Sequence, residues 1–351
     1  MVYSYDPYQN QGPPPGGPNM RYAPPDFFFA ARQRERRKIR RYANRLWAIG
    51  ILALVAAAVA RALFAAPFHL ADAVNGTARA SLEIHYGWGV VLTQVLPVLL
   101  GELILLLLGY RQLAEGIRWR FPESLARPQK AGLTVFAGFA CVGGGLAAAL
   151  ISYLFAYPLS LLGMNLYAQE LNTPTQLGPR LAVTAFVYLL SPVLQELIFR
   201  GIFLNNLRRY GQKSAIFTTA LLCAFFQLRF DTFLGTFLIG VVLGYLAVLT
   251  GDIRPVVIAR VLAEAVMGLM AAASDAAGSI AFTAVYLVLM YLVLLAFMIV
   301  NMGKVRTGGS ILTTGQQVGA SLSGPCAVLG IIAYILLNLS RLIGSSVWMA
   351  A

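Results

Sequence analysis

Two pairs of oppositely charged residues stand inside apolar segments of this chain. Glu196 and Arg200 are four residues apart, and so are Arg260 and Glu264. On a helix this spacing places both members of a pair on one face, close enough to form an ion pair. An unpaired charge near the centre of a membrane-spanning helix costs about 2.5–3.5 kcal/mol. The pairs are therefore either structural or functional: a carboxylate there could act as a general base, and a guanidinium could stabilise an oxyanion.

The composition is that of a membrane protein. Hydrophobic residues make up 58% of the 351 positions and charged residues only 12%, whereas soluble domains carry about 25% charged residues. A helix needs about 20 apolar residues to cross the hydrocarbon core, and this rule predicts about nine spans. They lie at about 46–68, 88–108, 131–155, 181–210, 214–230, 233–250, 255–273, 280–300 and 325–343. The predicted fold class is an all-α polytopic bundle of about nine transmembrane helices.

Basic residues dominate the charge of the chain, which is +13 overall. The densest basic run, Arg32–Arg45, directly precedes the first predicted span. Because Lys and Arg lie mainly on the cytoplasmic side, we expect an integral protein of a bacterial plasma membrane with a cytoplasmic N-terminus. The expected partners of the chain are the lipid bilayer and, at Arg32–Arg45, anionic lipids. No nucleic-acid partner is expected, since the charge adjoins membrane spans.

The chain divides into four predicted regions, at 1–45, 46–180, 181–273 and 274–351. The first is expected to be a disordered cytoplasmic tail that ends in the basic run, because its Pro- and Gly-rich part cannot bury a core. The second and fourth hold N-terminal and C-terminal transmembrane helices, and the third is a separate core. Glycines at 143–145, with Gly240 and Gly244, would allow close helix packing.

Histidine and cysteine, which carry much of enzyme and metal chemistry, are scarce in this chain. The two histidines, His69 and His85, are expected in an outer loop. The three cysteines lie in apolar segments and are expected to be small core residues. Arg229 and Asp231 are expected in a solvated turn between two spans. The predicted bundle therefore holds no histidine that could serve as a base or a zinc ligand.

The third region resembles the CPBP family of CAAX proteases and bacteriocin-processing proteins, also called Abi. Residues 195–201, Gln-Glu-Leu-Ile-Phe-Arg-Gly, are similar to its first motif, Glu-Glu-x-x-x-Arg. The second motif, Phe-x-x-x-His, falls at Cys223–Gln227, and the third, His-x-x-x-Asn or Asp, falls at Arg260–Glu264. The resemblance covers about 180–272. It implies a helical core that cleaves peptide bonds inside the membrane, where Glu and His hold or activate water, directly or with a metal.

Several reactive positions of that pattern are substituted in this chain. The positions equivalent to the motifs are Gln195, Glu196, Arg200, Gln227, Arg260 and Glu264. Gln195 replaces a Glu, Gln227 and Arg260 replace His, and Glu264 replaces Asn or Asp. An amide is neither a base nor a good zinc ligand, so no metal and no other cofactor is expected. If these side chains converge, they would form a network of two ion pairs bridged by two amides.

Three functions stay open on the sequence. The chain could be a CPBP-like pseudoprotease that has lost peptidase activity and binds a membrane protein or peptide, as a scaffold or immunity-type protein. It could instead be an active intramembrane peptidase that uses Glu196 as its base. It could also be a transporter or permease component whose polar path includes Glu102, Glu196 and Glu264. Glu102 interrupts the second span, and its partner cannot be identified from the sequence.

Overall fold

The structure is a computed structural model. It describes residues 25–76, 87–112, 127–162, 164, 174–277, 280–305 and 310–349. All regular elements within these residues are helices, which confirms the predicted all-α fold. The first part of the chain forms α1 (Pro25–Asn75), α3 (Gly87–Val90), η2 (Val91–Val95), α4 (Leu96–Gln112) and α5 (Arg127–Leu161). The last part forms α9 (Gln212–Phe226), α10 (Phe230–Thr250), α11 (Arg254–Ala277), α12 (Ile280–Met302), α13 (Thr314–Leu322) and α14 (Pro325–Met349).

Between these parts runs one long helical segment, 177–210, which carries the first motif. It comprises α6 (Leu177–Ala185), η3 (Phe186–Leu190), α7 (Ser191–Glu196), η4 (Leu197–Leu204), α8 (Asn205–Leu207) and η5 (Arg208–Tyr210). We call it the motif helix. The elements η3 and η4 are π-helical. Such turns are rare, and they occur frequently at functional sites.

Seven helices in the described residues are long and apolar enough to cross a membrane, which confirms a polytopic membrane protein. They lie at Phe29–Asn75, Gly87–Arg111, Lys130–Leu161, Leu177–Tyr210, Phe230–Thr250, Thr283–Met302 and Pro325–Leu342. The other two predicted spans are helices as well. The first, α9, is apolar but only 15 residues long, and the second, α11, carries both Arg260 and Glu264.

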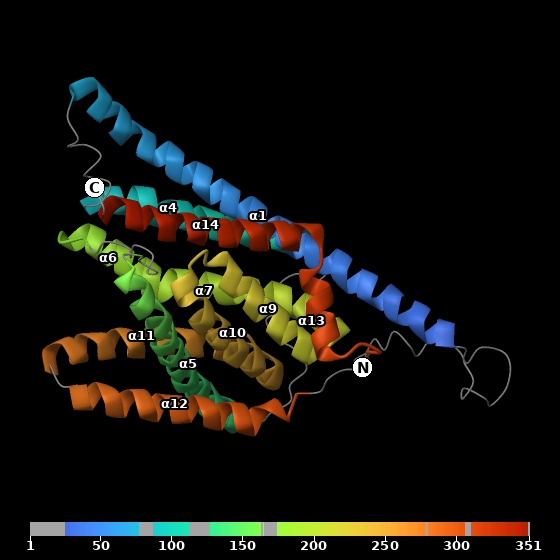
Figure 1. The fold of residues 1–351 in the computed structure, drawn as a ribbon. Coiled ribbons are helices and arrows are strands. Elements are labelled where there is room, and N and C mark those ends of the chain that lie inside the picture. The colour runs from blue at the N-terminus through green and yellow to red at the C-terminus, as the bar shows by residue number, and fades with distance from the viewer. Residues whose placement is uncertain are drawn as a thin grey trace, which may run out of the picture.

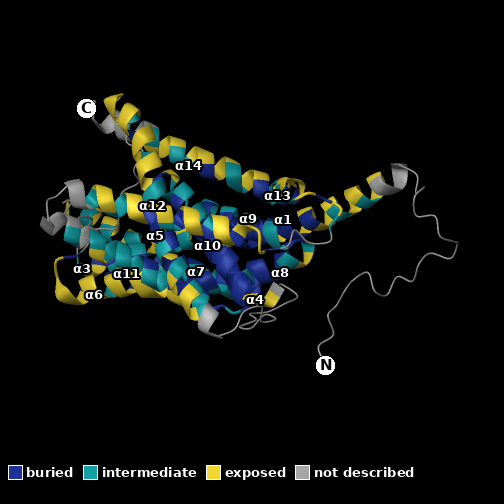
Figure 2. Ribbon diagram, turned by 90° about the horizontal axis from the view of Figure 1, so that it is seen from below, coloured by how far each residue is buried: buried dark blue, intermediate teal, exposed yellow. Residues whose placement is uncertain are grey.

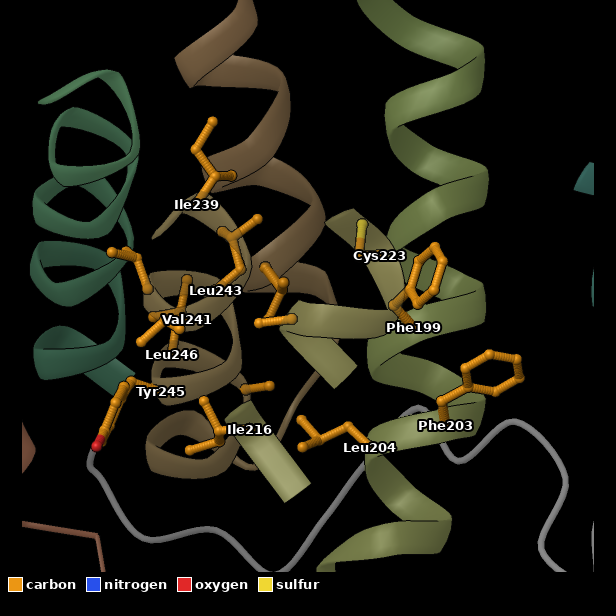
Figure 3. Packing of buried hydrophobic residues seen from close by; sticks show 14 of the residues in the cluster. Phe199, Phe203, Leu204, Ile216, Cys223, Ile239, Val241, Leu243, Tyr245 and Leu246 are labelled. Atoms are coloured by element: carbon orange, nitrogen blue, oxygen red, sulfur yellow. The ribbon is translucent and has the colours of Figure 1, made fainter. Parts of the chain in front are cut away.

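The core of the bundle lies around α10. Of the most apolar stretch of α10, 61% is buried, against 11% for the peripheral helix α14. The helix α10 packs against α5 and α9, and α5 packs in turn against α11 and α12 (Figure 1). Figure 2 shows the buried residues concentrated in the middle of the bundle. Figure 3 shows Leu243 and Leu246 of α10 among the buried side chains near Phe199 and Leu204 of the motif helix.

Close approach between helices depends on the predicted small residues. A Cβ atom on Gly143 of α5 would overlap the carbonyl oxygen of Met290 on α12. A Cβ on Gly244 of α10 would lie 2.8 Å from the side chain of Ile216 on α9. Backbone cannot yield as a flexible side chain can, so glycine is required at Gly143.

We therefore expect Gly143→Ala to lower the thermal unfolding midpoint in detergent, by an amount equivalent to about 1–3 kcal/mol, because α12 must move away from α5. Gly132→Ala on the same helix is the matched control, since a Cβ there would meet nothing within 4 Å. Equal midpoints for the two variants would contradict this packing.

The N-terminal region differs from the prediction. Residues 1–24 lie outside the described residues, but residues from Pro25 on are helical and continuous with the first span. The run Arg32–Arg45 is therefore not part of a disordered tail. Its apolar residues Ile39, Tyr42 and Ala43 are buried, and this tertiary burial stabilises a helix that composition alone did not predict.

His69 and Asp231 have local environments that differ from the predicted ones. His69 lies in α1 and is exposed, because α1 extends to Asn75 instead of ending before a loop; His85 falls outside the described residues. Arg229 and Asp231 do adjoin the turn between α9 and α10, but Asp231 is buried. Its carboxylate pairs with Arg229 at 2.6 Å, and this pairing offsets the loss of water.

Candidate functional site

Glu196 and Arg200 form a buried ion pair within the motif helix. Arg200 Nη1 donates to Glu196 Oε1 at 3.2 Å, and Arg200 Nε lies 3.1 Å from Glu196 Oε2. The two side chains are 2% and 1% exposed. Arg200 Nη2 also donates to the carbonyl oxygen of Gly240 on α10, at 3.0 Å. Arg200 thus holds both oxygens of the carboxylate and ties the motif helix to the central helix.

A second polar cluster surrounds Gln195, which directly precedes Glu196 in the motif helix. Glu102 of α4 accepts hydrogen bonds through Oε1 from Ser191 Oγ at 2.5 Å and from Gln195 Nε2 at 3.2 Å. Gln195 Nε2 also donates to Ser191 Oγ at 3.0 Å. Gln227, directly after α9, donates from Nε2 to Gln195 Oε1 at 3.3 Å. We call these four side chains the amide cluster, and its hydrogen bonds are directed toward the carboxylate of Glu102.

The amide cluster contains two residues that the motif pattern does not include. Ser191 lies one helical turn before Gln195, and Glu102 lies on a helix that is distant in sequence. Glu102 Oε2 is buried and has no hydrogen-bond partner among the described residues. A charged residue inside a predicted span was the only sequence signal for Glu102, and it did not identify the partner.

Arg260 and Glu264 form the other ion pair, on α11. Arg260 Nη2 lies 2.7 Å from Glu264 Oε1, and the side chains are 14% and 17% exposed. Both residues are close enough to act electrostatically on Glu196. The two ion pairs thus interact electrostatically across α11 and α7, which pack together, while Gln195 bonds to both Gln227 and Glu102.

Two cysteines adjoin the ion pairs. Cys141 of α5 and Cys223 of α9 are buried free thiols, as expected of small core residues. Cys141 lies on α5, which packs against α11, the helix of Arg260, and Cys223 lies on α9, which packs against η4, the helix of Arg200.

The turn that follows Gln227 is held by the peripheral helix α14. Tyr334 Oη donates to the carbonyl oxygen of Arg229 at 3.1 Å, and Arg341 Nη1 donates to that of Leu228 at 2.7 Å. Asn338 Oδ1 accepts from the backbone N–H of Phe230 at 3.0 Å. Because these contacts satisfy the backbone of the turn, α14 positions the end of α9 where Gln227 lies.

The donor set does not fit the metal that the family resemblance would imply. Zinc is bound by thiolate, imidazole or carboxylate groups, whereas the motif-equivalent positions offer two amides and two carboxylates that are already paired with Arg. No group of three or more His, Cys, Asp or Glu side chains suitable for a metal occurs within the described ranges. We derive no reaction step through a metal.

Comparison with known protein families places the same residues in one segment. Residues 177–266 match the family model described as type II CAAX prenyl endopeptidase Rce1-like. The match covers roughly a quarter of the chain and includes all six motif-equivalent positions, but not Glu102. No curated protein and no solved structure matches the chain. Residues 177–266 are thus similar to the CAAX prenyl endopeptidases of the CPBP family.

Proposed function

We propose that this protein has lost peptidase activity and acts by binding a membrane protein or peptide partner. The observation that carries the proposal is the hydrogen bond between Gln195 and Gln227, at the positions where the family resemblance implies a Glu and a His. A neutral amide cannot accept a proton from water at useful rates, and it cannot replace an imidazole as a base.

The active-peptidase alternative requires Glu196 as its base, and the geometry disfavours this role. Arg200 occupies both oxygens of Glu196, and the pair is almost fully buried. A general base must reach the proton that it removes, within about 2.6–3.2 Å or through one water. Arg260, the candidate for oxyanion stabilisation, is likewise engaged by Glu264 at 2.7 Å.

The transporter alternative requires carboxylates that can load and release an ion. Glu196 and Glu264 are each paired with an arginine four residues away. Each pair neutralises its own charge, so neither carboxylate is a favourable cation site. Glu102 remains the one proposed path residue without a cationic partner in the described structure, and a single such carboxylate is weak support for a path.

The proposal is tested by peptide cleavage in nanodiscs, against prenylated and unmodified peptide pools. We expect no cleavage by the natural chain above the background of empty nanodiscs. Restored variants would carry Gln195→Glu, Gln227→His, Arg260→His and Glu264→Asn, with and without Glu102→Gln. Cleavage by the natural chain that disappears in Glu196→Gln would overturn the proposal and assign an unusual active site.

A partner is then sought in the membrane by photo-crosslinking from positions beside the amide cluster, with Ile311 near α13 as a distant control position. We expect a discrete crosslinked species from the former positions and none from the latter. Absence of any discrete species, combined with proton-coupled uptake into vesicles, would favour the transporter alternative.

A further inference from the structure

Five of the exposed cations on the N-terminal part of α1 follow a helical period. Arg34, Arg37, Lys38, Arg41 and Arg45 are separated by steps of three, one, three and four residues. At 3.6 residues per turn these positions share one face of a helix, and all of them are exposed. We call this face the cationic stripe.

The opposite face of the same segment is packed against the protein. Ile39 clusters with Leu312 and Ala320, and Tyr42 contacts the ring of Tyr210, with centroids 6.1 Å apart. The guanidinium of Arg209 lies 4.4 Å from the centroid of the Tyr42 ring. These contacts fix the rotation of α1 about its axis, so the cationic stripe always faces away from the bundle.

Within the described residues, the stripe is not neutralised by acidic side chains. The only acid within the run is Glu35, and its Oε1 accepts a hydrogen bond from Ser310 at 2.6 Å. In the part of the chain that the structure describes, no acidic side chain forms an ion pair with a stripe residue. Like charges on adjacent turns repel one another, so the stripe gains most from a polyanionic partner.

The position of the stripe along α1 indicates which polyanion it meets. The helix continues from Arg45 into the first span without a break (Figure 1). At 1.5 Å per residue the stripe extends about 16 Å from that span. The headgroup layer is roughly 5–8 Å thick, and the Debye length in physiological salt is about 8 Å. The stripe therefore lies within the headgroups and the electric field just above them.

We propose that the cationic stripe is a binding site for anionic phospholipid headgroups at the cytoplasmic surface. The membrane is present at the foot of the stripe in every molecule, so the interaction needs no separate association step. Each cation near an anionic surface contributes about 1 kcal/mol, and the fixed orientation of α1 limits this contribution to one face. The inference does not depend on whether the protein retains peptidase activity.

The test uses the full chain in phosphatidylcholine vesicles that contain traces of spin-labelled phosphatidylglycerol or spin-labelled phosphatidylcholine. The motionally restricted fraction of each label measures lipid contact with the protein. We expect the restricted fraction to favour phosphatidylglycerol about fivefold at low salt, and this preference to decrease toward one at high salt. Equal fractions for both labels at low salt would overturn the proposal.

A matched pair of variants separates an oriented site from general charge. The stripe variant carries Arg37→Gln, Lys38→Gln and Arg41→Gln, and we expect it to lose at least half of the preference. The control variant removes the same charge from the same helix, away from the stripe, through Arg32→Gln, Arg36→Gln and Arg40→Gln. We expect it to retain most of the preference.

Two outcomes would assign the charge differently. Equal losses in the stripe and control variants would show that overall charge, and not an oriented stripe, attracts the lipid. Weaker binding of an added oligonucleotide to the stripe variant, with the phosphatidylglycerol preference of that variant unchanged, would assign the stripe to nucleic acid. Either result overturns the lipid site proposed here.

Discussion

Replacement of Arg200 by Met is expected to destabilise the protein by about 3–5 kcal/mol, because it leaves the buried carboxylate of Glu196 without a cation. It also removes the donor to the Gly240 carbonyl oxygen, 3.0 Å away on the central helix. The measurement is the thermal unfolding midpoint in detergent, followed by loss of the monodisperse peak in size-exclusion chromatography. We expect the midpoint to fall by roughly 10 °C.

Two controls make this result specific. Arg254→Met removes a cation from an ion pair in which the arginine is exposed: Arg254 is 57% exposed, and its Nε lies 3.7 Å from Asp252 Oδ1. Exposed pairs contribute about 0–1 kcal/mol, so the midpoint should hardly change. In the double variant Arg200→Met with Glu196→Leu, most of the lost stability should return, since no charge remains buried. A single variant as stable as Arg254→Met would contradict the buried ion pair.

Gln195→Glu is expected to have the second largest effect, although it restores the residue that the family motif carries. In the structure Gln195 Nε2 donates to Glu102 and to Ser191. A carboxylate at this position loses both donors and places a second acid beside Glu102. Burying an unmatched polar group costs about 1–3 kcal/mol, and more if it is charged. The same measurement of thermal unfolding in detergent should show a clear fall in the midpoint.

The rescue experiment distinguishes this explanation from general intolerance at position 195. Adding Glu102→Gln to Gln195→Glu returns one carboxylate and one amide to the amide cluster with their places exchanged. We expect the double variant to recover at least half of the lost stability. Failure to recover, with Gln195→Met as stable as the natural chain, would show that Glu102 does not depend on the residue at 195. The result also decides which restored variant is worth testing for peptide cleavage.

The membrane architecture and the motif positions were determined by local sequence alone. Runs of about 20 apolar residues predict spanning helices because the bilayer has a fixed thickness. The pairs Glu196–Arg200 and Arg260–Glu264 were predictable for a similar reason, since side chains at i and i+4 meet on any helix. In these cases the physical cause acts within one continuous segment of the chain.

Tertiary structure decided every contact that joins distant segments. Ser191 and Gln195 meet Glu102 across 89 and 93 residues, and Gln227 meets Gln195 across 32. Such contacts depend on how helices pack and rotate, which the periodicity of a single helix does not specify. Burial of Asp231 and the extension of α1 through the basic run have the same origin. The sequence thus determined which polar residues enter the bundle, and packing determined which of them become partners, because an unpaired polar group in the low-polarity interior costs free energy.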